Sequence, residues 1–354
     1  MNLVFVTRKI DRNDSRTGFV FDWLTKLAAK LDKLYVICQE KGDASGLPEN
    51  IEIHSLGKEQ GLGKLAQGFN LLSLSFSLGK KSDGFFVHMM PVYAIISGLS
   101  AKLLGKKMIF WYTHKSVNLK LRLATMLADE IFTASPESFR LASKKVRVVG
   151  HGIDIQKFQA PSSKLQINSK FQIISIGRIS PVKDYETLIK AVAILVNEKN
   201  ITDVSVNIYG EPAKPADHAY FADLKEFVRK AHLQNNIFFR GAVAHDKTPE
   251  IYQKADLLVN LSETGSLDKN VLEAAAAGTL VLSSNEAFTE KLSTISSHLT
   301  FEHDHPEGLA QKIETLKNLP TADRVALSQI LNTWVSQEHN LANLVNRIVE
   351  TYRP

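Results

Sequence analysis

Short apolar runs alternate with amphipathic stretches through the first half of the chain. The runs predict buried strands at residues 3–6, 34–38, 51–54, 85–88, 108–112, 131–133 and 146–149. After the first of them, residues 19–27 place apolar side chains three and four positions apart, which predicts a helix. Strands that alternate with helices indicate βαβ units, and therefore a mostly parallel sheet.

The alternation restarts after a polar stretch at residues 159–164, which we interpret as a linker between domains. Strands are expected at 171–176, 204–209, 237–239, 257–261 and 280–283, helices at 185–196, 221–231, 248–254 and 271–277, and further helices from 306 to 352. The pattern predicts an α/β protein of two doubly wound, Rossmann-like domains, 1–160 and 165–330. A helix over 331–354 is expected to pack back toward the N-terminal domain. Ligands would bind beyond the carboxyl ends of the strands, in a cleft that both domains face.

The composition is that of a globular protein from a reducing compartment. The chain has 354 residues, of which 44% are hydrophobic, so it is too long for one ordinary domain and too apolar for a disordered chain. Its single cysteine, Cys38, allows no intramolecular disulfide. The apolar run at 3–6 is too short for a secretory signal, so we expect a cytoplasmic protein.

The charge is divided unevenly between the two halves. Lysine and arginine outnumber aspartate and glutamate by 24 to 14 over residues 1–164 and are outnumbered by 19 to 23 over 165–354. A basic half suits phosphates, nucleic acid or an anionic membrane, although an unevenly charged soluble surface is an equal alternative. No aromatic and basic RNA-readout motif is present, which weakens the case for nucleic acid.

Two cations follow the predicted strand at 171–176. Arg178 and Lys183 stand between the end of that strand and the next helix. Cations that converge beside the free N–H groups of a helix N-terminus suit a diphosphate. The alternative is an exposed loop with two solvated cations, and the spacing alone does not decide between them.

A polar, glycine-containing loop follows the strand at 257–261 and leads into an alanine-rich helix. Glu273 is expected in the first turn of that helix, where it would stabilise the helix dipole or, beside a diphosphate, bind ribose hydroxyls. Asp268 and Lys269 are expected at the loop tip, available to a sugar. His114 follows an aromatic strand, where α/β sheets present functional side chains, although a lone histidine is more often structural.

Taken together, these segments resemble the retaining glycosyltransferases of the GT-B fold, family 4. The matching pieces, in chain order, are residues 149–154 with Phe158, Gly177-Arg178 with Lys183, the turn at 207–212, the strand end at 238–243, and Leu272-Glu273-Ala274 with Gly278. The resemblance is clear over residues 145–285 and weak in the N-terminal half apart from His114.

The resemblance implies roles for particular residues. Arg178 and Lys183 would hold the donor diphosphate, Glu273 the ribose, and His114 the transferred sugar or the acceptor; these four are the implied catalytic residues. The implied donor site contains Gly18, Arg178, Lys183, Gly210, Gly241, Val243, Gly265, Ser266, Leu267, Asp268, Lys269 and Glu273. The family loop usually carries two glutamates eight positions apart, but here the earlier position is Gly265, so the donor sugar is left open.

The implied activity is transfer of a hexose from a UDP- or GDP-linked sugar to a lipid-linked or saccharide acceptor, with retention of configuration, in cell-envelope or polysaccharide biosynthesis. The alternatives are a GT-B-fold sugar-nucleotide epimerase and an inactive GT-B binding protein. No metal is expected to be obligatory, since two cations neutralise a diphosphate. In this family the N-terminal domain binds the acceptor, so its basic surface would contact either an anionic membrane peripherally or a soluble phosphorylated acceptor.

Overall fold

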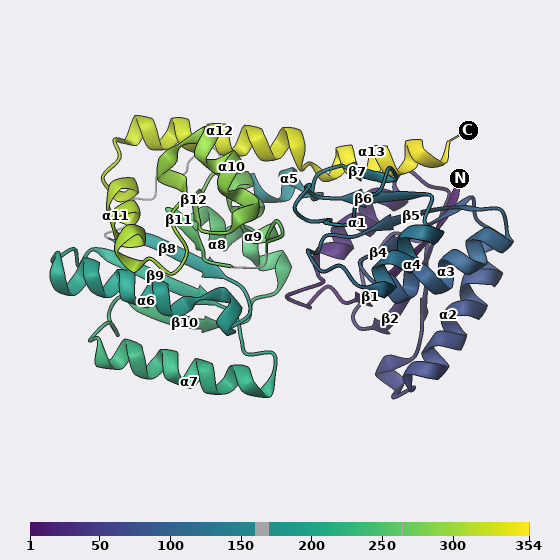
Figure 1. The fold of residues 1–354 in the computed structure, drawn as a ribbon, viewed down its shortest axis with the longest axis horizontal. Coiled ribbons are helices and arrows are strands. Elements are labelled where there is room, and N and C mark those ends of the chain that lie inside the picture. The colour runs from purple at the N-terminus through teal and green to yellow at the C-terminus, as the bar shows by residue number, and fades with distance from the viewer. Residues whose placement is uncertain (160–169, 263–264, 354) are drawn as a thin grey trace. The chain divides into compact units, whose positions relative to one another are not determined.

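The computed structural model describes residues 1–159, 170–262 and 265–353. These fall into two compact units (Figure 1). Unit 1 comprises residues 1–154, 244–246 and 339–354, and unit 2 comprises residues 155–243 and 247–338. Most of the predicted linker at 159–164 lies outside the described residues.

Unit 1 is built on a seven-stranded sheet in the order β3-β2-β1-β4-β5-β6-β7, with every neighbouring pair parallel. The strands are β1 (Asn2–Ile10), β2 (Lys33–Lys41), β3 (Ile51–Ser55), β4 (Gly84–His88), β5 (Lys107–Trp111), β6 (Glu130–Thr133) and β7 (Val146–Val148). The helices include α1 (Phe19–Ala28), α2 (Lys64–Gly79), α3 (Pro91–Leu103), α4 (Leu119–Leu127) and α13 (Leu341–Tyr352). The strand order reverses beside β1, where doubly wound sheets present their binding loops.

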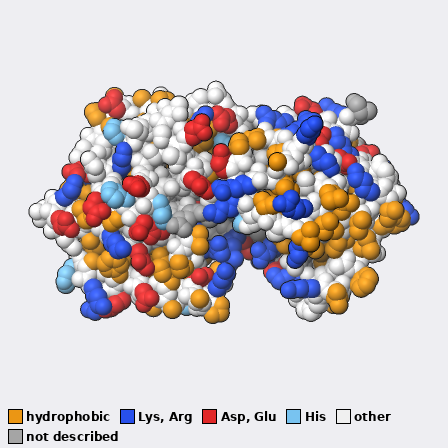
Figure 2. Space-filling view, viewed as in Figure 1, with side chains coloured by type: hydrophobic (Ala, Val, Ile, Leu, Met, Phe, Trp, Pro, Cys, Tyr) orange, Lys and Arg blue, Asp and Glu red, His pale blue; other side chains and the backbone are white. Residues whose placement is uncertain are grey.

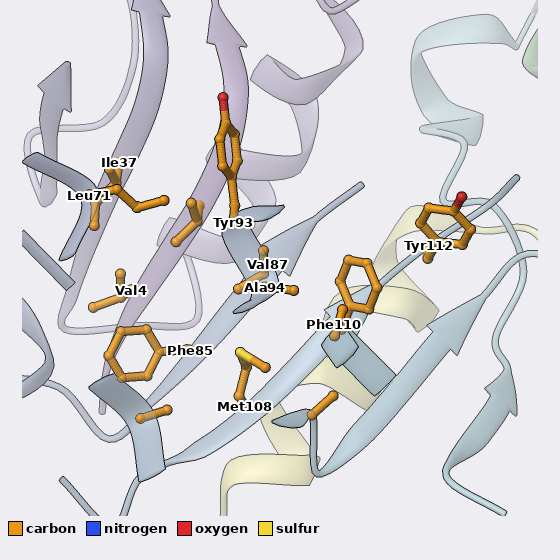
Figure 3. Packing of buried hydrophobic residues seen from close by; sticks show 14 of the residues in the cluster. Val4, Ile37, Leu71, Phe85, Val87, Tyr93, Ala94, Met108, Phe110 and Tyr112 are labelled. Atoms are coloured by element: carbon orange, nitrogen blue, oxygen red, sulfur yellow. The ribbon is translucent and has the colours of Figure 1, made fainter. Parts of the chain in front are cut away.

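One part of the core of unit 1 lies between one face of this sheet and the inner faces of α2, α3 and α4. Alternate residues of β4 and β5, such as Phe85, Val87 and Phe110, point to the same side of the sheet and are fully buried (Figure 3). Leu71 of α2 and Ala94 of α3 cover them from the helix side. Each helix therefore contributes one apolar face to the core, and the opposite face is left at the surface.

Unit 2 contains a five-stranded parallel sheet in the order β10-β9-β8-β11-β12. The strands are β8 (Phe171–Ile176), β9 (Val204–Tyr209), β10 (Ile237–Gly241), β11 (Leu257–Asn260) and β12 (Leu280–Ser283). The helices are α5 (Ile155–Phe158), α6 (Tyr185–Ala193), α7 (Pro215–Lys230), α8 (Thr248–Lys254), α9 (Lys269–Ala276), α10 (Glu286–Ile295), α11 (Pro306–Lys317) and α12 (Thr321–Glu338). The α/β architecture of two Rossmann-like, doubly wound sheets with C-terminal helices is the one predicted.

Three helix boundaries differ from the prediction for identifiable reasons. Helix α7 begins at Pro215 rather than 221, because proline suits the first turn and Asp217 accepts backbone hydrogen bonds at the N-terminus. Helix α6 ends at Ala193 and continues as the π-helical turn Ile194–Glu198. Helix α9 begins at Lys269 rather than 271, which changes the position of Glu273 within it. In the described ranges, no helix combines the length and apolarity needed to cross a membrane.

Candidate functional site

The carboxyl edge of the unit 2 sheet gathers most of the residues that the resemblance assigns to a donor. Residues 177–178 follow β8, Gly210 follows β9, Gly241 ends β10, and the loop at 265–268 connects β11 to α9 (Figure 1). Because the neighbouring strands are parallel, these ends meet at one edge of the sheet. The structure therefore brings together segments that are distant in the chain, from residues 177–178 to 265–268.

Glycine at position 210 lets the ends of two strands approach each other closely. A Cβ atom there would lie 1.7 Å from the carbonyl oxygen of Gly177, and the residue has a φ of 150°. Its N–H donates to the carbonyl of Gly241 at 2.8 Å, and the N–H of Gly177 donates to that of Tyr209 at 2.9 Å. Backbone hydrogen bonds thus hold the ends of β8, β9 and β10 at a spacing that requires glycine.

Lys183 is held in an ion pair at this edge. It ends the 3-10 turn Pro181–Lys183, and its Nζ lies 3.0 Å from Oδ2 of Asp268, which also accepts a 2.9 Å hydrogen bond from Asn260. The side chains of Lys183 and Asp268 are only 14% and 17% exposed. The interpretation of two solvated cations is therefore wrong for Lys183. Asp268 is the N-cap residue of α9 and a partner of this lysine rather than a free group at a loop tip.

Arg178 lies at the same strand end but is exposed. The Lys183 side chain runs close to Gly177, since its Cε lies 3.4 Å from the place where a Cβ of that glycine would stand. Both cations therefore lie near the end of β8. The Asp268 carboxylate holds Lys183 in place, whereas Arg178 is open to solvent.

Three buried polar residues that the sequence analysis missed fix the loop at 265–268. Ser283 donates to the Asn260 side-chain oxygen at 3.0 Å, and the Asn285 N–H donates to the Ser283 hydroxyl at 3.1 Å. The Asn285 amide then donates to the carbonyl of Ser266 at 3.0 Å. All three are at most 2% exposed. The available signal was a polar residue at the end of an otherwise apolar strand, which marks a group that the fold uses for hydrogen bonding.

Gly265 occupies the position of the usual first glutamate. It is buried, with a φ of 58°, a left-handed conformation that residues with side chains rarely adopt. A glutamate in this backbone conformation would therefore be strained. Leu267 points inward, with 8% exposure, so it can offer a ligand little beyond its backbone.

Glu273 is not in the first turn of its helix, which corrects the expected capping role. It is the fifth residue of α9, it is 5% exposed, and its Oε2 accepts a 3.0 Å hydrogen bond from the hydroxyl of Tyr252. Burial and the neighbouring Glu273 carboxylate raise the pKa of Tyr252 well above its ordinary value, so the phenol remains a proton donor. The role of Glu273 at a ribose stays a prediction.

A second carboxylate missed by the sequence analysis faces the turn after β10. Glu211 Oε1 accepts a hydrogen bond of 3.3 Å from the N–H of Ala242, between Gly241 and Val243. Gly241 has a φ of 78°, so the turn depends on glycine. Glu211 therefore holds the turn that the resemblance assigns to the donor site.

Gly18 belongs to unit 1, at the start of α1. A Cβ there would lie 2.7 Å from the carbonyl oxygen of Asp14, so the loop closes tightly on the helix. Burial raises the pKa of Asp14, but hydrogen bonds from Lys9 and from the N–H groups of Arg16 and Thr17 outweigh it and lower that pKa to about 2. A permanently charged carboxylate thus organises the loop in front of Gly18.

His114 also belongs to unit 1, where it follows β5 and is exposed. Its Nδ1 accepts a 3.0 Å hydrogen bond from the N–H of Ser116, which places the proton of the neutral ring on Nε2. Burial first, and the charge of Lys115 second, lower the pKa of His114. The imidazole is therefore neutral at pH 7 and presents a donor nitrogen. His88, which ends β4, is buried, and its Nδ1 lies 3.2 Å from the Thr7 hydroxyl.

A cavity of about 470 Å³ lies elsewhere in unit 2, between the sheet and α8, lined by residues that include Gln172, Asn207 and Arg240. Its lining contains none of the implied donor residues, so it is distinct from the edge described above. Among the described residues, no cluster of three or more His, Cys, Asp or Glu is suited to hold a metal ion.

Each unit is built on a parallel, doubly wound sheet, and in unit 2 the implied donor residues gather at the carboxyl edge of that sheet. This architecture is that of the GT-B fold found in glycosyltransferases. The same fold occurs in Anabaena HepE solved in complex with UDP and glucose, at a TM-score of 0.77 and 16% identity over 99% of this chain and 98% of that one. It occurs also in sucrose-phosphate synthase of Thermosynechococcus elongatus, at a TM-score of 0.75 and 15% identity, over 100% and 98% of the two chains. These likenesses confirm the predicted fold class.

Residues 157–330, just under half of this chain, match the family "Glycosyl transferases group 1", and this match assigns that segment to the family. Mannosylfructose-phosphate synthase of Agrobacterium fabrum is 26% identical over 150 residues, 40% of this chain and 33% of the relative. D-inositol 3-phosphate glycosyltransferase of Paenarthrobacter aurescens is 26% identical over 180 residues, 49% and 43% of the two chains. The matches thus span less than half the length of these curated relatives. The expected glycosyltransferase family is thereby confirmed for residues 157–330.

Proposed function

We propose that this chain is a glycosyltransferase that moves a hexose from a UDP- or GDP-linked donor to a lipid-linked or saccharide acceptor, with retention of configuration. The observation that supports this most is the carboxyl edge of the unit 2 sheet, where Arg178 and the Lys183–Asp268 pair stand beside backbone that only glycine permits. This edge lies inside the segment that matches the family.

Unit 2 would hold the nucleotide sugar by its diphosphate. In the reaction, the bond between the anomeric carbon and the terminal phosphate oxygen breaks, and its electron pair passes to the diphosphate. The acceptor hydroxyl oxygen bonds to the anomeric carbon, and its proton passes to the departing phosphate or to solvent. Arg178 and Lys183 would lower the barrier by neutralising the charge that develops on the leaving group.

The ion pair of Lys183 with Asp268 gives both residues a role in this step. A diphosphate competes with Asp268 for the ammonium group, because both are anions within reach of one cation. When Lys183 turns toward the diphosphate, Asp268 is left at the N-terminus of α9 with its Asn260 partner, ready to accept a hydrogen bond from a sugar hydroxyl. We therefore assign Asp268 to the sugar and Lys183 to the phosphate.

The remaining groups of unit 2 would bind the nucleoside. The turn at Gly241–Val243, held by Glu211, offers backbone groups to the base. Glu273 would accept hydrogen bonds from the ribose while Tyr252 satisfies its buried oxygen. Gly265, Ser266, Leu267 and Lys269 would contribute the loop on which the sugar rests, its course fixed by the Asn285 amide.

Unit 1 would bind the acceptor. Gly18, at the start of α1, would approach the donor phosphate closely because it has no side chain. His114, neutral with its Nε2 protonated, would donate a hydrogen bond to a sugar hydroxyl of the donor or acceptor. No metal is required in this account, since Arg178 and Lys183 provide the neutralisation, and turnover should be insensitive to EDTA.

The test is turnover by Arg178→Ala and Lys183→Ala. Each variant should lose about tenfold or more of the wild-type rate, because each removes one charge-assisted contact to the leaving group. Lys190→Ala, which removes an exposed lysine of α6, is the matched control and should retain the wild-type rate. Near-wild-type rates in both site variants would contradict the proposal that Arg178 and Lys183 bind the donor diphosphate. Conversion of one sugar nucleotide into another without release of the nucleoside diphosphate would indicate an epimerase, and binding without turnover an inactive binding protein.

A further inference from the structure

Helix α2 carries a second apolar face that points away from the core. Leu71 and Leu78 are buried against the sheet, whereas Leu65 and Phe69 are 83% and 73% exposed. Leu72 and Phe76 extend the exposed stripe at spacings of three and four residues, so all four lie on one side of the helix. A helix at the surface of a soluble domain normally carries polar residues there.

The neighbouring helices continue this face. Helix α3 packs against both α2 and α4, so the three lie side by side (Figure 1). Their outer sides expose large apolar residues at helical spacing, namely Leu65, Phe69, Leu72 and Phe76 of α2, Val92, Leu99 and Leu103 of α3, and Leu119, Leu123 and Met126 of α4. Figure 2 shows hydrophobic side chains gathered over this part of unit 1. We refer to these ten residues as the apolar face; an exposed patch of this kind marks an interaction surface.

Cations outnumber acids in the sequence that carries the apolar face, and two of them, Lys102 and Lys107, pair with Asp129 and Glu130, which follow α4. Residues 60–128 contain nine cations, Lys64, Lys80, Lys81, Lys102, Lys106, Lys107, Lys115, Lys120 and Arg122, against the single acid Asp83. Several of them flank the helices: Lys64 begins α2, Lys80 follows it, and Lys102 lies in the last turn of α3. Long cationic side chains at the edge of an apolar surface reach anionic headgroups while their neighbours enter the acyl region.

The cations beside the apolar face favour one kind of binding partner over the others. A second copy on a two-fold axis would place these cations against the same cations, which opposes association. A protein interface disfavours lysine, whereas eight of the nine cations are lysines. An anionic bilayer satisfies both the lysines and the scattered apolar side chains.

We propose that α2, α3 and α4 form a docking surface for an anionic lipid bilayer, with Leu65, Phe69 and Leu103 inserted and the flanking lysines at the headgroups. The inference deepens the proposed function, since it identifies where the enzyme would meet a lipid-linked acceptor. Its binding test uses no donor or acceptor, so the docking surface and the transferase activity can fail independently.

The experiment is co-sedimentation of the full chain with vesicles of phosphatidylcholine alone or with about 30% phosphatidylglycerol. Wild-type protein should bind the anionic vesicles and be released by high salt, because the attraction is screened. The double variant Leu65→Ser/Phe69→Ser should bind the anionic vesicles about tenfold less, since two inserted side chains are lost. The control Val325→Ser/Ile330→Ser, on exposed apolar positions of α12 in unit 2, should bind as wild type does.

The variants remain interpretable because the residues are exposed and the fold does not depend on them. Near-ultraviolet circular dichroism and release of nucleoside diphosphate from the donor should match the wild type. Equal binding to neutral and anionic vesicles, or wild-type binding by the double variant, would overturn the proposal. So would concentration-dependent dimers in sedimentation analysis, lost on Leu65→Ser/Phe69→Ser, without vesicle binding.

Discussion

Cations serve different purposes in the two units. In unit 2, Lys183 is largely buried and paired at 3.0 Å with Asp268, at the end of a strand whose backbone is fixed by glycine contacts. In unit 1, Lys64, Lys80 and Lys102 stand at the ends of helices that expose apolar residues, and Lys102 pairs with Asp129 at the surface. A largely buried cation held by a carboxylate in a fixed place suits one specific anion, whereas surface cations beside an apolar face suit a diffuse anionic surface.

The distribution of exposed apolar residues separates the units in the same way. Of the sixteen large apolar side chains that are exposed among the described residues, thirteen belong to unit 1 and only Val182, Val325 and Ile330 to unit 2. Unit 2 thus resembles an ordinary soluble domain in its surface, and its chemistry is concentrated at one sheet edge. Unit 1 keeps a second apolar face that its own core does not use.

Of the substitutions that test this difference between the units, Gly210→Ala in unit 2 should have the largest effect on stability and nucleotide binding. The new Cβ would meet the Gly177 carbonyl at 1.7 Å, so the strand ends must separate. We expect a loss of about 2–4 kcal/mol in the free energy of unfolding together with loss of nucleotide binding. Urea denaturation and calorimetry with UDP and GDP measure the two effects.

Gly68→Ala in α2 is the matched control. A Cβ there meets nothing within 4 Å, and alanine favours a helix over glycine by about 0.5–1 kcal/mol. This variant should therefore be as stable as the wild type or more so. Equal effects of the two substitutions would contradict the claim that glycine at 210 sets the spacing of the sheet edge.

The next effect is on the ion pair. Asp268→Asn removes the anion that competes with the donor diphosphate for Lys183, so nucleoside diphosphate should bind several-fold more tightly. Hexose transfer should instead fall by about tenfold, because the sugar loses a charged acceptor. Calorimetry and turnover separate the two, with Asp223→Asn on the exposed side of α7 as the control. Weaker diphosphate binding in Asp268→Asn would be inconsistent with the assigned competition.

A smaller effect tests the buried carboxylate. Tyr252→Phe removes the 3.0 Å hydrogen bond to Glu273 and leaves a buried carboxylate oxygen without that donor, so the free energy of unfolding should fall by about 1–3 kcal/mol. Tyr112→Phe in unit 1 removes a 3.2 Å bond to the carbonyl of exposed Ser116, which water can replace, and should cost less. A larger loss for Tyr112→Phe in denaturant titrations would reverse this expectation.

The smallest effect is a shift in one titration. Burial and Lys115 hold the pKa of His114 below its ordinary value, so the ring is neutral at pH 7 and becomes charged only as the pH falls through the lowered pKa. Lys115→Gln should move that pKa up toward the ordinary value, as followed by proton NMR of the imidazole. If turnover needs the neutral ring, its acid limb should move to higher pH in the same variant. If the His114 titration is unchanged by Lys115→Gln, the charge of Lys115 does not lower the His114 pKa.

Much of the fold follows from local pattern. The strands and most helices were predictable because apolar runs and helical spacing can be recognised within short segments of the sequence, as in β8 and α8. Helix starts were less predictable. Helix α7 begins at Pro215, because proline geometry and the backbone hydrogen bonds to Asp217 act before the first apolar residue, and α9 begins at Lys269, two residues before the predicted start.

The site was predictable in part. The positions of Arg178 and Lys183 at a strand end follow from the strand-then-helix pattern. The pairing of Lys183 with Asp268 does not, because 85 positions separate them and only the parallel order of β8 and β11 brings them together. Likewise, Tyr252 reaches Glu273 through packing of α8 on α9, which no local spacing encodes.

The central claim is that this chain transfers a hexose from a nucleotide sugar, and incubation with a panel of UDP- and GDP-sugars tests it most directly. Proton NMR would follow the nucleoside diphosphate and the configuration of the first sugar product. The account predicts that at least one donor releases its nucleoside diphosphate with retained configuration, at a rate that Lys183→Ala reduces and Lys190→Ala does not. Consumption of no donor, or product of inverted configuration, would contradict it.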